Sequence, residues 1–183
     1  MSEWGPLAAL VGDWEGTGGL DTAFSHSEEQ VINTPYFEKV EMKPFGPVAN
    51  GDQQLWGLDY HSAMWRESED IPFHTEVGYW LYDPATGEIL RGFVVPRGIT
   101  VLAGGQADAD AKQFTMSARA GDPLYPIGEN RYLAERASTR LYTVTVTLND
   151  DDTWSYAETT LLQMTEIPGE LAHNDANTLH RRN

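Results

Sequence analysis

The stretch RLYTVTVTLNDDDTWSYAETTLLQM, residues 140–164, decides the fold class of this 183-residue sequence. Between Arg140 and Leu148, apolar side chains alternate mostly with threonines, which is the period-two pattern of a strand with one buried face. Acidic residues and Asn149 then predict a turn, and large apolar side chains return at alternate positions from Thr153 to Met164. The stretch is therefore predicted to form a β-hairpin.

A second hairpin is expected between His74 and Val95, around the turn Asp83–Gly87, where a proline and a glycine suit a tight reversal. The segment Gly5–Gly12 predicts a short N-terminal helix. About ten antiparallel strands with short connections favour a closed up-and-down β-barrel over a sandwich, because closure leaves no exposed sheet edge. The fold class is therefore all-β. The further strands are expected at Phe37–Phe45, Gln54–Arg66, Ile99–Gln106, Gln113–Arg119 and Asn177–Arg181.

Length and composition favour one domain over residues 1–183, because 40% apolar and 11% aromatic residues can fill a single core. The formal net charge of −16 would repel nucleic acid and anionic membranes, so neither is an expected partner. The absence of cysteine excludes disulfides, zinc–thiolate sites and iron–sulfur clusters. The sequence shows neither a long apolar run nor a signal-peptide pattern, so a cytoplasmic location is expected.

A barrel of this strand number can be filled by its own side chains or can hold one small ligand. The many tryptophans and tyrosines between Trp56 and Tyr82 suit either a packed interior or a cavity for a flat hydrophobic ligand, and the sequence leaves both open. The loop Gly121–Asn130 is expected at one end of the barrel, as a plain surface loop or as a lid. The assembly is compatible with a homodimer.

A glycine-rich motif follows the predicted helix, with Gly12, Trp14, Gly16 and Gly18 at alternate positions. It is not a phosphate-binding loop, because the lysine and the flanking elements of such loops are missing. The glycines let a strand bend sharply, and Trp14 is expected to plug one end of the barrel.

This frame around Trp14 resembles the start of the nitrobindin family of heme-binding β-barrels, which are similar in shape to fatty-acid-binding proteins and lipocalins. The segment Pro72–Tyr79 matches that family's Pro-x-His-x-Glu-x-Gly-aromatic strand. Gly98, Met164 and the basic pair Arg181-Arg182 fall where family members have a glycine, a pocket methionine and a closing basic pair. The resemblance therefore covers most of the chain.

The resemblance implies a ten-stranded barrel whose apolar cavity holds ferric heme b, ligated by one histidine on the last strand. Family members are associated with reversible nitric oxide binding and with isomerising peroxynitrite to nitrate. Enzymatic activity as a peroxynitrite isomerase would depend on the heme. The cofactor-binding positions that the resemblance suggests are His173, His74, Met164, Trp80 and Gly98.

The chain departs from the family at the iron ligand. Counting from Met164 places the ligand at Asn174, and counting back from Arg181 places it at Asp175, and neither is an ordinary heme ligand. His173 is the candidate metal ligand, and a small bulge would restore its direction towards the cavity. Alternatively, His173 bonds a neighbouring carboxylate, and His74 is either a cavity residue or a satisfied core histidine.

The alternative function is a non-heme carrier or sensor of a fatty acid or similar apolar small molecule. Its carboxylate would need a cationic partner. A third interpretation is a barrel filled by its own aromatic side chains. The candidate carboxylate partners are Arg97, Arg119, Arg131, Arg136 and Arg140.

Overall fold

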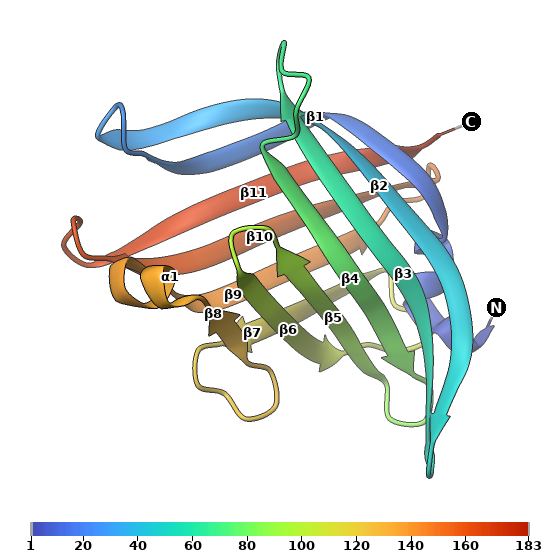
Figure 1. Cartoon of the computed structure of the whole chain (residues 1–183). Coiled ribbons are helices and arrows are strands. Elements are labelled where there is room, and N and C mark those ends of the chain that lie inside the picture. Colours follow the sequence, from blue (N-terminus) through green and yellow to red (C-terminus); the bar gives the residue numbers. More distant parts are fainter. Residues whose placement is uncertain (1, 183) are drawn as a thin grey trace.

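The strands of the computed structural model, which describes residues 2–182, form an eleven-stranded antiparallel sheet that closes on itself (Figure 1). Ten strands make the ring, which is closed by the pairing of β5 with β6 and of β1 with β11. The short β8 pairs with β6 beside the ring, and helix α1 follows it. The elements are η1 Ser2–Leu10, β1 Gly12–Ser25, β2 Gln30–Asn50, β3 Gln53–Arg66, β4 His74–Asp83, β5 Glu88–Val95, β6 Ile99–Gln106, β7 Gln113–Arg119, β8 Ile127–Glu129, α1 Arg131–Arg136, β9 Ala137–Leu148, β10 Thr153–Met164 and β11 Glu170–Arg181.

The closed barrel and both predicted hairpins are confirmed. Several boundaries differ from the expectations. Strand β2 extends beyond Phe37–Phe45 at both ends, β11 begins at Glu170 rather than at Asn177, and the loop Gly121–Asn130 contains β8. The sequence pattern fails there because both ends of β2 are largely exposed, the first half of β11 carries polar residues on the inner face, and β8 pairs for only three residues. No helix among residues 2–182 is long and apolar enough to cross a membrane.

The N-terminal segment closes one end of the barrel as a 3₁₀ helix that is interrupted at Gly5, where φ is +52°. Leu7 and Leu10 are fully buried. The indole Nε1 of Trp14 donates a hydrogen bond to the Leu10 carbonyl at 2.8 Å, and the ring packs edge-on against Trp154. Trp14 is thus buried at the end of the barrel where the sequence places it.

The glycine-rich part of β1 contains a register shift, which lies between Gly16 and Gly19 in the pairing with β2. A Cβ atom at Gly19 would lie 2.3 Å from the ring of Tyr36, so only glycine leaves room for this ring. A Cβ atom at Gly18 would meet nothing within 4 Å. The bulge therefore lets Tyr36 reach inside the barrel wall.

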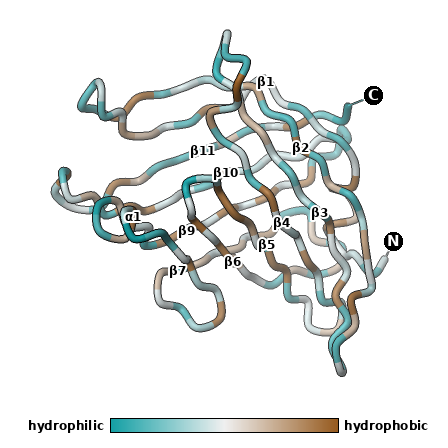
Figure 2. Tube along the Cα trace, viewed as in Figure 1, coloured by the Kyte–Doolittle hydropathy of each residue, from teal (hydrophilic) through white to brown (hydrophobic). Residues whose placement is uncertain are grey.

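The barrel interior has three layers along its axis. The end covered by η1 is apolar and aromatic, with Trp80 and Ile89 almost fully buried. A layer of buried polar side chains follows, and beyond it the barrel opens into a cavity. Figure 2 shows the apolar runs in the middle strands and hydrophilic residues at the hairpin turns.

Candidate functional site

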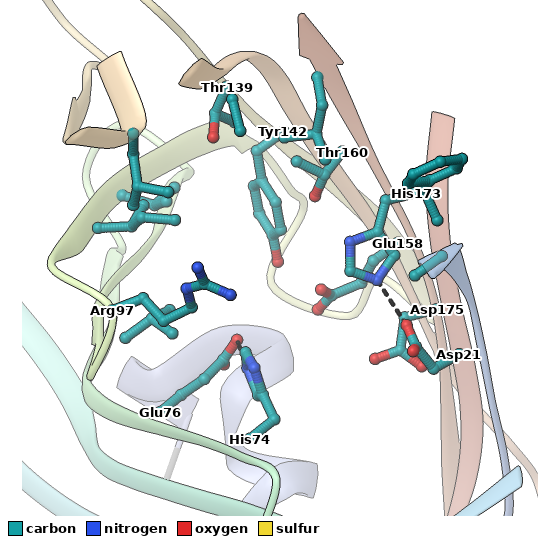
Figure 3. A pocket seen from close by; sticks show the side chains of 18 of the residues that line it. Asp21, His74, Glu76, Arg97, Thr139, Tyr142, Glu158, Thr160, His173 and Asp175 are labelled. Atoms are coloured by element: carbon teal, nitrogen blue, oxygen red, sulfur yellow. Dashed lines mark hydrogen bonds and ion pairs between the residues drawn. The ribbon is translucent and has the colours of Figure 1, made fainter. Parts of the chain in front are cut away.

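A cavity of about 420 Å³ lies at the end of the barrel opposite η1, within the range of small-molecule sites. The barrel thus has an open cavity, rather than an interior wholly filled by aromatic side chains. The cavity lining combines apolar side chains with acids, histidines and hydroxyl groups, and Figure 3 shows Asp21, Asp175 and His173 together on one side, across the cavity from Arg97. The apolar lining residues are Phe24, Met64, Phe73, Phe93, Val95, Ile99, Val101, Leu133, Leu162, Met164 and Leu171.

The polar layer below the cavity is centred on Arg91, which is only 4% exposed. Its guanidinium forms ion pairs with Glu76 and Glu158, and it donates to the hydroxyl groups of Tyr60 and Tyr142. Burial alone would raise the pKa of Glu76, but Arg91, assisted by His74 and Tyr60, outweighs it and lowers this pKa to about 2. The carboxylate of Glu76 is therefore held in its charged form.

His74 lies on β4 at the edge of this layer, and its Nε2 is 3.2 Å from Glu76 Oε1. Burial disfavours the charged imidazole, but the hydrogen bond and charge of Glu76 outweigh burial and raise the pKa of His74. His74 lines the cavity, as the resemblance suggests. Trp80 instead lies in the apolar core, with its ring centroid 5.0 Å from the Arg91 guanidinium, and so outside the residues that line the cavity.

A chain of hydrogen bonds joins a buried carboxyl group to the cavity. Tyr156 donates to Glu38 Oε2 at 2.8 Å, the hydroxyl oxygens of Tyr156 and Tyr36 are 2.7 Å apart, and Tyr36 bonds Asp175. These three contacts need three protons, and the two tyrosines supply only two. The chain is therefore complete when Glu38 or Asp175 holds a proton.

Burial favours that protonation at both ends. It raises the pKa of the fully buried Glu38 to about 7, although Asn177, Ser62 and Tyr156 donate hydrogen bonds that oppose the rise. Burial, reinforced by the charge of Glu158, raises the pKa of Asp175 to about 8.

The register of three neighbouring strands explains the position of Asp175. It lies directly opposite Asp21 on β1 and Glu158 on β10, so it is the middle of a row of three carboxyl groups on the inner face. Asp21 pairs with His173, and Glu158 pairs with Arg91. Asp175 has no cationic partner among residues 2–182, so a proton relieves its repulsion from both neighbours.

His173 lies on the cavity side of β11, two residues nearer the mouth than Asp175. Its Nε2 is 2.5 Å from Asp21 Oδ1, and its Nδ1 has no partner among residues 2–182 (Figure 3). The pairing of β10 with β11 runs without a register shift, so the expected bulge is absent there. Plain alternation points His173 inwards, whereas Asn174 faces outwards and accepts a hydrogen bond from Thr159.

The remaining predicted positions surround the cavity mouth. Met164 lines the cavity, and Gly98, with φ at +82°, forms the β5–β6 turn between the lining residues Arg97 and Ile99. Of the five arginines that the sequence suggests as carboxylate partners, Arg97 alone lines the cavity. Arg66, which the sequence did not suggest, lines it too, and its guanidinium lies 4.4 Å from the ring centroid of Phe73.

Sequence reasoning missed Glu38, Arg91 and Asp175. A signal was present for two of them: Arg91 interrupts the apolar inner positions of β5, and Glu38 interrupts those of β2 between Tyr36 and Val40. A charged residue on the buried face of a strand requires a partner, and such a break in the pattern marks an internal polar site.

Comparison with known proteins adds to this geometry. The model of the family described as "THAP4-like, heme-binding beta-barrel domain" matches residues 3–181. The chain belongs to this family. The nitrobindin-like resemblance seen in the sequence is thereby confirmed.

Two proteins named peroxynitrite isomerase are similar to this member of the THAP4-like family. That of Clavibacter michiganensis subsp. michiganensis is 34% identical over 77 residues, and that of Clavibacter sepedonicus is 31% identical over 77 residues. Each match covers 41% of this chain and only 33% of the relative. The crystal structure of Rv2717c from M. tuberculosis superposes with a TM-score of 0.70 at 21% sequence identity. The match covers 97% of this chain and 95% of the Rv2717c chain, which shows a shared fold.

Proposed function

We propose that this barrel binds one ferric heme b in the cavity, with His173 as the iron ligand, and acts on nitrogen oxides such as peroxynitrite. The observation that carries the proposal is the pair formed by His173 and Asp21 on the cavity wall. The family description and the name of the two Clavibacter relatives support it.

The donor set of the cavity fits this group. Histidines that ligate metals almost always donate their second ring N–H to a carboxylate, carbonyl or water, which fixes the tautomer and orients the ring. Asp21 accepts from Nε2 of His173, and this tautomer leaves a lone pair on Nδ1, the nitrogen without a partner. The two side chains thus offer one oriented nitrogen ligand.

The enclosure fits as well. The apolar side chains of the lining suit a flat macrocycle, and in the polar layer beneath the cavity Arg91 and His74 face Glu76 and Glu158. When bound, the heme supplies a ferric iron that coordinates a nitrogen oxide. His74 lines the same cavity, and its raised pKa favours the protonated imidazole, which can donate a hydrogen bond to an anionic oxygen.

The alternative function, a carrier of a fatty acid or similar molecule, rests on Arg97. Arg97 lines the cavity, Figure 3 shows its guanidinium pointing into the cavity, and this guanidinium has no ion-pair partner among residues 2–182. On the wall that carries Asp21 and Glu158, the cationic groups of His173 and Arg91 are already paired with these acids, so the carboxylate of a fatty acid would bind towards the mouth.

A hemin titration of the apo-protein followed by absorbance tests the proposal. We expect a saturable one-to-one Soret shift in the wild type and in His180→Ala, an exposed histidine on the same strand that serves as control. His173→Ala should lose the shift while its circular dichroism stays unchanged, and His74→Ala should only perturb it. A Soret shift of the same affinity in His173→Ala would overturn the ligand assignment.

A further inference from the structure

One hydroxyl group in the cavity has no hydrogen-bond partner. Thr139 on β9 is only 3% exposed and lines the cavity, and its Oγ1 is buried without a partner among residues 2–182. Its surroundings in the cavity are apolar and include Leu133 of α1 and Leu162, which lies opposite it on β10. A buried polar atom without a partner is costly, which points to a group that completes it when a ligand is bound.

The direction of Thr139 depends on an irregularity of β9. Leu141 pairs with Leu161, but the next pairing joins Thr139 to Leu162, so β9 has one extra residue at this point. The bulge reverses the alternation. It turns Arg140 outwards, where its guanidinium bonds Gln163, and it turns Thr139 into the cavity.

The distribution of charged side chains in the cavity indicates which kind of group the Thr139 hydroxyl would bind. The acids Asp21, Asp175 and Glu158 occupy the wall formed by β1, β11 and β10. Arg97 lies on another side, and Figure 3 shows Arg97 and Thr139 away from Asp21 and Asp175. Glu129 of β8 links the two regions, because it pairs with Ile99, two residues after Arg97, and accepts from the backbone N–H of Thr139.

We propose that Arg97 and Thr139 form a subsite for a carboxylate of the cavity ligand, in which the hydroxyl of Thr139 donates a hydrogen bond to the carboxylate. Arg97 supplies the charge near the mouth, whereas His173 and Arg91 on the opposite side are already paired with acids. The subsite rests on the coarser part of the proposed function, one organic ligand in the cavity. Heme propionates and fatty acids share the required chemistry, so both serve as probes.

The unbound protein gives the first test. Thr139→Val keeps the volume and removes the unpaired hydroxyl, so we expect the apo-protein to melt about 3 °C higher, because the desolvation cost of that hydroxyl disappears. Thr139→Ser keeps a hydroxyl and serves as the matched control. A melting temperature lowered by Thr139→Val would show that the hydroxyl is already satisfied and would overturn the proposal.

Although Thr139→Val should stabilise the unbound protein, it should weaken ligand binding. Thr139→Val and Arg97→Met should each weaken binding of hemin, or of oleate, by about tenfold, as expected for a lost charge-assisted hydrogen bond. Arg119→Met, an exposed arginine that does not line the cavity, should bind as the wild type does. Hemin dimethyl ester and methyl oleate, which lack the carboxylate, should bind wild type and Thr139→Val equally.

The two probes separate this proposal from the heme proposal. If oleate alone binds and its affinity falls in both variants, the subsite stands and the heme function fails. A second outcome is that hemin binds through His173, that its dimethyl ester binds the wild type as tightly as hemin does, and that both variants bind hemin as tightly as the wild type. The subsite then fails and the heme function stands. Failure of the wild type to bind either acid would overturn the subsite.

Discussion

The buried carboxyl group of Glu38 should make the stability of the barrel depend on pH. Burial raises its pKa to about 7 in the folded protein, against 4.5 for an exposed glutamate. The folded state therefore holds a proton more tightly than the unfolded chain, and stability is complete below pH 4.5 and is lost as the pH rises to 7. The replacement Glu38→Gln mimics the protonated form and removes this loss.

The magnitude follows from the difference between the two pKa values. At 1.36 kcal/mol per pKa unit, a change from 4.5 to about 7 corresponds to about 3 kcal/mol of lost unfolding free energy, most of it between pH 5 and pH 8. A glutamine can keep the local hydrogen bonds. Its carbonyl accepts from Tyr156 and Asn177, and its amide donates to Ser62.

Urea unfolding at pH 5 and pH 8 measures the effect. The wild type should lose about 2 to 3 kcal/mol more unfolding free energy between these pH values than Glu38→Gln does. Glu41→Gln, which changes an exposed acid on the same strand, should follow the wild type. An equal loss in the wild type and in Glu38→Gln would refute the claim that Glu38 is charged only at the expense of stability.

Two further changes test the polar layer and the bulge of β1. Arg91→Met should lower the unfolding free energy by about 3 to 5 kcal/mol in urea titrations, because Glu76 is left buried without the Arg91 cation. A loss below about 1 kcal/mol would contradict a stabilising role of this ion pair. Gly19→Ala should lower the unfolding free energy by about 1 to 3 kcal/mol because the new Cβ would collide with Tyr36. Gly18→Ala should leave the unfolding free energy nearly unchanged in the same assay. Equal effects of the two substitutions would show that the bulge is not needed.

Sequence periodicity predicts those parts of the fold in which one face of a strand is apolar. The alternation between Arg140 and Leu148 is such a case, and the hairpin that it predicts is present. The first half of β11 escapes this reasoning because His173 and Asp175 are polar residues on the inner face. Hydrophobic alternation there stops before the strand does.

The candidate site is less accessible to sequence reasoning because its contacts are distant in the chain. Glu38 and Tyr156 are 118 residues apart, and only closure of the barrel brings them together. The direction of His173 follows from strand alternation, but its pairing with Asp21, 152 residues away, depends on the register of β1 against β11. The bulge that aims Thr139 inwards leaves no mark in the residue pattern.

The resonance Raman spectrum of the ferrous heme complex shows directly whether His173 ligates the iron. We expect an iron–histidine stretching band in the wild type, at a lower frequency in Asp21→Asn because the carboxylate no longer strengthens His173 as a ligand. The band should be absent in His173→Ala. An unchanged band in His173→Ala would contradict the assignment of His173 as the iron ligand.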